Sequence, residues 1–284
     1  MILVDMNQVM ISNLMAQIGN HTNTKIEENM FRHMVLNSIR SYNVKFSPKY
    51  GKMIIACDSG NCWRKKVFPY YKANRKKKNE NSELDWKIIY SHMNKIVSEI
   101  KENFPYKVLA IELAEADDII ASIVKKNAED NTNEKILILS GDKDFIQLHQ
   151  QENVEQYDPV RKKWIKHENP NEFLKEHIVK GDFGDGIPNI FSPDNCLVIG
   201  ERQKTVTKQK LSNMMNTEVG DYDSILKKNF YRNQQLIDLT FIPQDLYERI
   251  ISEYKKDGIK DRSKILNYMI KNKLSNLTEY ITEF

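Results

Sequence analysis

The chain has 284 residues, of which 40% are hydrophobic and 29% are charged, and its formal net charge at pH 7 is +4. This length allows one large domain, or one domain with a helical addition. No apolar run is long enough to span a bilayer, and the start of the chain lacks the basic and long apolar parts of a signal peptide, so we expect no membrane contact. Three cysteines, an odd and sparse set, argue against a disulfide framework.

In chain order, short apolar runs alternate with segments of helical periodicity up to about residue 180. This alternation predicts an α/β domain with a mainly parallel central sheet flanked by helices over residues 1–180. The remainder, residues 181–284, is almost wholly helical in pattern. The predicted strands are 2–5, 53–58, 108–111, 135–140, 154–157 and 164–166. The predicted helices are 7–18, 26–42, 84–103, 115–127, 205–215, 222–239, 244–255 and 263–271.

Carboxylates stand where the predicted strands end. Because ligands of open α/β sheets bind outside the carboxyl ends of the strands, we expect these acids to converge at one edge. Taken singly, each has a plainer interpretation, such as a helix cap or an Asx turn. Their joint placement favours a metal site, because so many carboxylates cannot share a cleft without counter-cations. The candidate ligands are Asp5, Asp58, Glu115, Asp117, Asp142, Asp144, Asp182 and Asp185.

The segment from Glu115 to Ala121 is central to this set, because it places three carboxylates within four residues ahead of an apolar stretch. Acids at this position suit a helix start, since the helix dipole favours negative charge there. We expect Glu115 and Asp117 to point into the site. Asp118 either caps the helix or supports its neighbours.

The chemistry of the donors predicts the kind of metal. Oxygen ligands, with no histidine or cysteine nearby in the sequence, select hard ions, so we expect two Mg²⁺ ions, for which Mn²⁺ can substitute. Magnesium usually keeps several waters and is completed by phosphate oxygens of the substrate. Two such ions about 4 Å apart clamp the attacking and leaving oxygens of a phosphodiester.

The most basic stretch of the chain runs from Trp63 to Lys78, with aromatic residues among the charges. A run of this kind is often only a solvated surface. Its position directly after an acidic strand end instead favours contact with a polyanion. We expect Arg64, Lys72 and Arg75 to grip phosphates, whereas Tyr71 either stacks on an exposed base or belongs to the core.

The order of these motifs resembles the flap endonuclease family of structure-specific 5′ nucleases over essentially the whole chain. The segments 233–243 and 274–284 resemble phage members of that family that remove RNA primers. The motifs that carry the resemblance are Asp5, Asp58, Arg64 with Tyr71-Lys72-Ala73-Asn74-Arg75, Glu115-Ala116-Asp117-Asp118, Gly141-Asp142-Lys143-Asp144 and Gly181-Asp182-Phe183-Gly184-Asp185.

The resemblance implies a 5′ nuclease or PIN-like core, a helical arch at about residues 72–104 and a C-terminal DNA-binding region of helix-hairpin-helix type. Lys72 and Arg75 would be the catalytic cations at the scissile phosphate. Lys204 would contact nucleic acid from a turn that only partly follows the family's glycine-rich pattern, which leaves a monovalent cation there in doubt. The implied ligands are Asp5, Asp58, Glu115 and Asp117 for the first metal, and Asp142, Asp144, Asp182 and Asp185 for the second.

The implied activity is 5′→3′ removal of RNA or DNA from RNA–DNA hybrids and DNA duplexes, with cleavage of 5′ flaps and forks. The resemblance implies a monomer in the cytoplasm of a phage-infected bacterium that binds single-stranded DNA-binding protein through its C-terminal helices. The first strand begins at the second residue, with no room for a clamp-binding peptide, so contact with a sliding clamp is left open. Two alternatives are a PIN-type single-strand ribonuclease and a non-catalytic flap-binding replication factor. The helical second half disfavours the former, and the intact acid set disfavours the latter.

Overall fold

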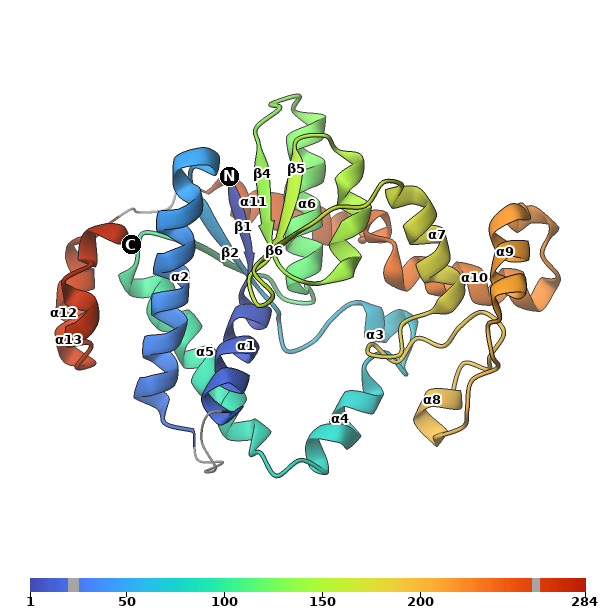
Figure 1. Ribbon diagram of the computed structural model, residues 1–284, viewed down its shortest axis with the longest axis horizontal. Helices are drawn as coiled ribbons and strands as arrows, with labels where there is room; N and C mark the ends of the chain where they lie inside the picture. The colour runs from blue at the N-terminus through green and yellow to red at the C-terminus, as the bar shows by residue number, and fades with distance from the viewer. Residues whose placement is uncertain (20–25, 257–260) are drawn as a thin grey trace.

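The computed structural model describes residues 1–19, 26–256 and 261–284, and its centre is a six-stranded sheet (Figure 1). The strand order is β3-β2-β1-β4-β5-β6, and every neighbouring pair is parallel except β5 and β6. The predicted mainly parallel sheet flanked by helices is confirmed. The connection after β1 leads to β2 on one side of it, and the connection after β4 leads to β5 on the opposite side. The carboxyl ends of β1 and β4 therefore form a topological switch point. The strands are β1 Ile2–Asp5, β2 Met53–Cys57, β3 Lys107–Ala110, β4 Ile136–Leu139, β5 Val154–Asp158 and β6 Lys163–Ile165.

Helices cover both faces of the sheet and extend beyond it. In the described part of the chain, none is long and apolar enough to cross a membrane. The α-helices are α1 Met6–Gly19, α2 Glu28–Tyr50, α3 Arg64–Val67, α4 Ala73–Glu80, α5 Trp86–Asn103, α6 Ala116–Glu129, α7 Pro170–Lys180, α8 Cys196–Ile199, α9 Lys208–Asn216, α10 Ser224–Ile237, α11 Gln244–Lys255, α12 Ser263–Lys271 and α13 Ser275–Thr278. The 3₁₀ helices are η1 Lys143–Gln150, η2 Val219–Asp221, η3 Leu239–Phe241 and η4 Ile281–Glu283.

The short helices α3, α8 and α13 were not predicted, and two longer helices also differ from the sequence prediction. The predicted helix 26–42 continues as α2 to Tyr50, because Phe46 and Tyr50 extend its buried face past Pro48. Helix α7 was not predicted, although its start carries two local signals. The Asn169 side chain accepts a hydrogen bond from the Glu172 amide at 3.1 Å, and proline stands at the first helical position.

Alternation along the strands divides the core into two layers. Val4 and Ile55 face one side of the sheet and belong to a cluster with α1, α2, α5 and α12. Their neighbours Leu3 and Ile54 face the other side, among side chains of α6 and α11. Because successive strand residues point to opposite faces, the continuous apolar runs seen in the sequence are those of strands buried on both sides.

A third apolar cluster joins the helical region to the basic segment. Val179 of α7 and Phe230 of α10 pack in it together with Phe68 and Tyr71. Helices α11 and α12 do not join this cluster and instead pack against the two faces of the sheet. The last strand ends at Ile165 and α7 lies before the predicted boundary at residue 180, while α11 and α12, beyond residue 243, pack with the sheet.

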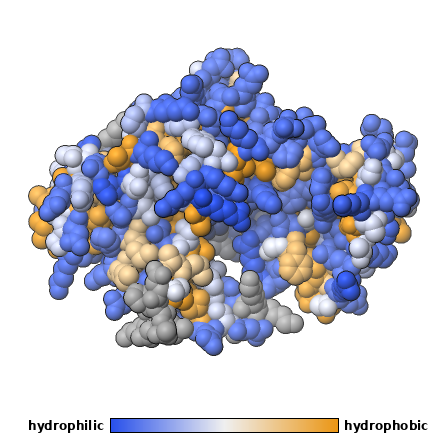
Figure 2. Space-filling model, viewed as in Figure 1, coloured by the Kyte–Doolittle hydropathy of each residue, from blue (hydrophilic) through white to orange (hydrophobic). Residues whose placement is uncertain are grey.

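Helices α4 and α5, with the turn between them, occupy the position of the expected arch at residues 72–104 (Figure 1). Asp85 caps the start of α5, and its side chain accepts hydrogen bonds from the amides of the first turn. The helix buries Ile89, Met93 and Ile96 in the core, so most of α5 is held against the sheet layer. Because most of α5 is packed in the core, we restrict the predicted arch to α4 and the turn that follows it. Hydrophilic residues cover most of the face shown in Figure 2.

Candidate active site at the carboxyl edge of the sheet

The acids that follow the strands meet at the switch point. Asp5 ends β1, and its Oδ2 accepts a hydrogen bond from Ser140 Oγ, just after β4, at 3.0 Å. Asp58 follows β2, and its Oδ1 accepts from the Ala116 amide at the start of α6 at 2.7 Å. Asp142 follows β4 and accepts from the Asp144 amide at 3.0 Å. The predicted helix-cap and Asx-turn bonds thus coexist with the convergence of the acids.

The start of α6 is organised by a capping box. Asp118 Oδ2 accepts from the Glu115 amide at 2.9 Å, and the Glu115 side chain accepts from the backbone in return. Asp118 is fully buried and also accepts from Trp63 Nε1 at 3.2 Å. It both caps the helix and supports its neighbours, so the two interpretations left open from the sequence apply together. Asp117 lies near Asp5 and Asp142, whose negative charges act on it.

Two residues expected to contact nucleic acid are buried instead. Arg64 is 2% exposed and donates to Glu115 at 2.9 Å and to the Leu236 carbonyl at 2.8 Å. Tyr71 is 3% exposed, and its hydroxyl lies 3.0 Å from Glu115 Oε2 and 2.9 Å from Asp185 Oδ2. The predicted phosphate contact of Arg64 is at odds with this placement, because its side chain offers no surface to a ligand. Of the two alternatives for Tyr71, the structure favours the core over base stacking. Both residues instead fix the orientation of Glu115.

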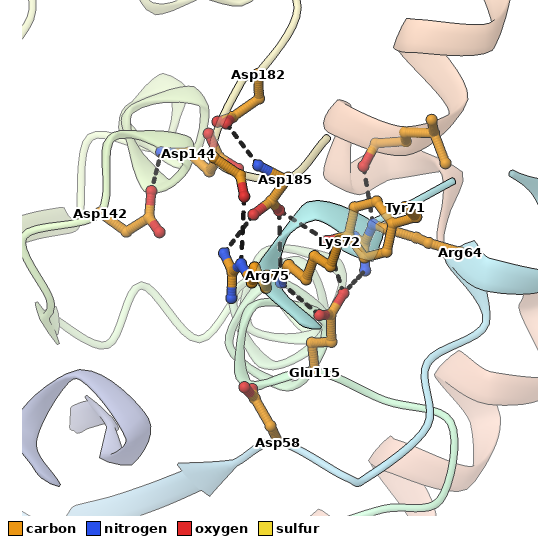
Figure 3. Close-up of polar contacts among 12 residues, drawn as sticks. Asp58, Arg64, Tyr71, Lys72, Arg75, Glu115, Asp142, Asp144, Asp182 and Asp185 are labelled. Atoms are coloured by element: carbon orange, nitrogen blue, oxygen red, sulfur yellow. Dashed lines mark hydrogen bonds and ion pairs between the residues drawn. The ribbon is translucent and has the colours of Figure 1, made fainter. Parts of the chain in front are cut away.

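Lys72 and Arg75 lie within the acid set, between Glu115 and Asp185 (Figure 3). Lys72 Nζ is 2.6 Å from Glu115 Oε1 and 3.4 Å from Asp185 Oδ2. Arg75 pairs with Asp185 and donates from Nε to the Gly184 carbonyl at 3.2 Å. Lys72 has φ +56°, a left-handed conformation uncommon for lysine, and its amide donates to the Asp185 carbonyl at 2.7 Å. The backbone and the side chain of Lys72 are therefore both held by contacts with Glu115 and Asp185.

A histidine that the sequence interpretation missed belongs to the same site. His177, in the last turn of α7, lies with Nδ1 3.3 Å from Asp144 Oδ1 and Nε2 3.4 Å from Asp182 Oδ2. Among the described residues, these three form a group whose ligand atoms lie within 4.8 Å of one another. The expectation that no histidine lies near the acids is wrong at this end. The overlooked signal was the Asn169-Pro170 helix start, which places His177 in the turn just before Gly181.

The pKa directions show which acids lack positive partners. Burial and the charge of Asp58 raise the pKa of Asp5 to about 7, and burial with the charge of Asp142 raises that of Asp144 to about 8. Burial also acts to raise the pKa of Glu115, but Lys72 and Arg64 outweigh it and lower the value to about 2. The cations of the chain thus satisfy Glu115 and leave other carboxyls crowded.

Neighbouring carboxylates raise the pKa values of both Asp117 and His177. Burial, followed by the charges of Asp142 and Asp5, raises the pKa of Asp117 well above its usual range. Burial acts to lower the pKa of His177, but its hydrogen bond to Asp182 and the charge of Asp144 raise it overall. The region therefore favours any added cation.

The Asp182–Asp185 turn is fixed by glycine and by its own hydrogen bonds. Gly181 has φ +66°, and a Cβ built there would lie 2.5 Å from the Ile187 carbonyl oxygen. The Asp185 amide donates to Asp182 Oδ1 at 3.0 Å, and the Ile187 amide donates to the Asp182 carbonyl at 2.7 Å. The turn presents both carboxylates from a rigid frame (Figure 3).

Lys204 lies apart from the acids in the loop before α9. Its amide donates to Ser192 Oγ at 2.9 Å, and its carbonyl accepts from Asn189 Nδ2 at 2.9 Å. No hydrogen bond or ion pair joins it to the acid set in the described part of the chain. Its side chain is exposed, so it is open to a ligand from solvent.

Comparison with known proteins identifies the relatives of this fold and site. Residues 1–183 match the model of the 5′-3′ exonuclease N-terminal resolvase-like domain, and residues 171–284 match the C-terminal domain of T4 RNase H. The chain is 33% identical to ribonuclease H of Enterobacteria phage T4 over 294 residues, covering 99% of this chain and 95% of the relative. It is 30% identical to a 5′-3′ exonuclease of Buchnera aphidicola over 222 residues, covering 74% of this chain and 69% of that protein.

Solved structures of bacteriophage T5 proteins share the fold. The T5 flap endonuclease in a complex with DNA and metal ions superposes with a TM-score of 0.62 at 17% identity, covering 90% of this chain and 99% of that one. The T5 5′-exonuclease with bound divalent zinc gives the same TM-score at 16% identity, covering 89% and 97%.

The fold, the acidic edge and these relatives define a 5′ nuclease, a hydrolase of nucleic-acid phosphodiesters. The chain belongs to the 5′-3′ exonuclease family, with a C-terminal part of the T4 RNase H type.

Replacing Gly181 with alanine should destabilise the protein and disturb the Asp182–Asp185 turn. The added Cβ would overlap backbone atoms at a positive φ, at a cost on the order of 3 kcal/mol. Gly220→Ala is the control, since nothing lies within 4 Å of a Cβ built there. Urea unfolding of both variants measures the difference. Equal unfolding midpoints would contradict the close approach described for Gly181.

The protein held in chelator should lose stability as the pH rises from about 5 to about 8. Asp5 and Asp144 have folded-state pKa values of about 7 and about 8, against an ordinary value of 3.8, so the stability they contribute is complete below pH 4 and is lost as the pH rises through those values. His177, with a raised pKa, acts in the same direction. Glu115 acts oppositely, but its contribution is already complete above about pH 5.

Thermal unfolding in chelator across this range measures the loss. Asp144→Asn should flatten the profile, because it removes one of the ionising groups. An unfolding temperature that rises steadily from pH 5 to pH 8 in the wild-type protein would refute the crowding of unpaired acids.

Proposed function

We propose that this protein is a Mg²⁺-dependent 5′→3′ exonuclease and flap endonuclease that removes RNA primers during phage DNA replication. Its substrates would be RNA–DNA hybrids, DNA duplexes, 5′ flaps and forks. The observation that carries the proposal is the convergence of carboxylates at the switch point, with Lys72 and Arg75 among them. The named activity of the T4 relative and the DNA and metal ions in the T5 complex support it.

The donor set fits divalent cations. Several carboxyls have raised pKa values because the chain supplies too little positive charge near them. We assign two Mg²⁺ ions, replaceable by Mn²⁺, which when bound lower the pKa of water and neutralise charge on the reacting phosphate. His177 offers one nitrogen beside the second position. The proposed ligands are Asp5, Asp58, Glu115 and Asp117 for the first ion, and Asp142, Asp144, Asp182 and Asp185 for the second.

The chain's own residues would position the substrate rather than attack it. The thiols of Cys57 and Cys62 are poor nucleophiles, because burial raises their pKa values to about 12 and about 11. Lys72 and Arg75 would bind the scissile phosphate, and the half-exposed Arg75 is the more accessible of the two. Arg64 and Tyr71 would keep Glu115 oriented while these cations engage the substrate.

The helical region and the C-terminal helices would bind the larger partners. The exposed Lys204 would contact the backbone of the duplex. Leu266 and Ile270 are exposed four residues apart on α12, which supports contact with single-stranded DNA-binding protein there. We propose a monomer that works in the cytoplasm of an infected bacterium. We leave contact with a sliding clamp open.

Asp142→Asn should abolish Mg²⁺-dependent cleavage and leave duplex binding within about 2-fold of wild type. The change removes a charge at the proposed second metal position, and we expect a rate loss on the order of 10³-fold. The measurement uses a 5′-labelled RNA–DNA hybrid, a 5′ flap and single-stranded RNA, each with Mg²⁺ and with chelator. Asp245→Asn, an exposed acid on α11, is the control and should cleave normally.

Three outcomes of this assay would count against the proposals. Normal turnover by Asp142→Asn would overturn its assignment as a ligand. No cleavage of any substrate by the wild-type protein would favour a non-catalytic flap-binding factor. Cleavage confined to single-stranded RNA would favour a PIN-type ribonuclease.

Lys72→Ala should slow single-turnover cleavage about 10²-fold, because a preorganised charge at the scissile phosphate is lost. Lys65→Ala, which removes an exposed lysine from the neighbouring α3, should not change the rate. Rates measured with enzyme in excess separate the chemical step from product release. An unchanged rate for Lys72→Ala would show that Lys72 only balances Glu115.

A further inference from the structure

Phe183 stands between two proposed metal ligands and faces solvent. Its side chain is 70% exposed, the largest fraction among the exposed large hydrophobic residues in the described part of the chain. A single exposed apolar residue is common on protein surfaces. This one differs in its place, because it occupies the Asp182–Asp185 turn, whose carboxylates point into the acid set (Figure 3).

Hydrogen bonds to two successive carbonyls hold the backbone at Phe183 and at the residue after it. Its carbonyl accepts from Asn74 Nδ2 of α4 at 2.8 Å and from the Gly186 amide at 3.2 Å. The next carbonyl, that of Gly184, accepts from Arg75 Nε at 3.2 Å. The turn is therefore tied to α4 and to a proposed phosphate-binding cation. The exposed ring is held at a defined distance from the acid set and does not belong to a loose loop.

In the described segments that form the site, no aromatic side chain other than Phe183 is exposed enough to receive a base. In the described segments 63–75 and 181–191, Trp63, Phe68 and Tyr71 are buried, and Tyr70 and Phe191 are half-buried. The charged residues of the site can bind phosphate but offer no surface to a nucleobase. An unpaired base next to the cleaved bond needs an aromatic face, and Phe183 alone among these aromatic residues is exposed enough to provide one.

We propose that Phe183 contacts the substrate by stacking on a nucleobase that flanks the scissile phosphate. Stacking there holds an unpaired nucleotide while Lys72 and Arg75 bind its phosphate. The ring tolerates the acidic surroundings because it carries no charge, and it accepts any base because every base has a π face. This assignment rests on the proposed nuclease function and adds to it the residue that positions the base.

The first test compares substitutions at Phe183 by single-turnover cleavage of a 5′ flap with Mg²⁺. Phe183→Ala should slow cleavage about 10- to 100-fold, whereas Phe183→Trp and Phe183→Tyr should stay within about 3-fold of wild type. Phe183→Leu keeps an apolar side chain without a π face and should be as slow as the alanine variant. Val44→Ala, at an exposed apolar residue on α2 to which no binding role is assigned, is the control and should cleave normally.

The second test removes the base instead of the ring. Flap substrates carry an abasic site at the nucleotide on one or the other side of the scissile phosphate. The penalty of Phe183→Ala should vanish on one of the two substrates, because the partner of the ring is then absent. A penalty that persists in full on both, or a wild-type rate for Phe183→Leu, would overturn the stacking. Failure of the wild-type protein to cleave any substrate would instead overturn the proposed function.

Discussion

Repulsion among carboxylates at one sheet edge is the constraint on which the rest of this structure depends. The strand order brings Asp5, Asp58 and Asp142 together, and the start of α6 adds Glu115 and Asp117. Neutral donors from Ser140 and the Ala116 amide orient two of these acids but add no charge. The positive charge must come from cations, and those that the chain supplies are concentrated on Glu115 and Asp185.

Arg64 shows how the site and the helical region depend on each other. It ion-pairs with Glu115 and Asp118 at the start of α6 and donates to the carbonyl of Leu236 in α10. A buried ion pair of this kind adds little net stability, but removal of one partner would leave an uncompensated buried charge. The third apolar cluster joins the same two regions, because Tyr71 packs in it beside α7 and α10. Arg64 thereby couples the orientation of a proposed ligand to the packing of the helical region.

Features that depend on residues close together in the sequence could be predicted from it. The apolar runs ending in acids predicted the strands, and the parallel order then predicted that the acids converge. Burial of a charged residue has no such local signal, so Arg64, which lies in a basic run, was expected at the surface, and the placement of Tyr71 was left open. His177 was missed for another reason: Asp144 lies 33 residues earlier, and only the fold of α7 brings the two together. Phe46 and Tyr50 extend α2 because their burial outweighs the proline within its last turn.

The same contacts account for both the folding of the site and its proposed chemistry. Lys72 and Arg75 pair with Glu115 and Asp185, so they reduce repulsion in the protein without substrate. A phosphate presents the same kind of oxygen to these cations as a carboxylate does. In the proposed function, divalent cations on the acids would take over this balance, and Lys72 and Arg75 would then bind the scissile phosphate. The strained backbone of Lys72 fits this proposed exchange, since its amide would stay bonded to the Asp185 carbonyl while its ammonium changed partner.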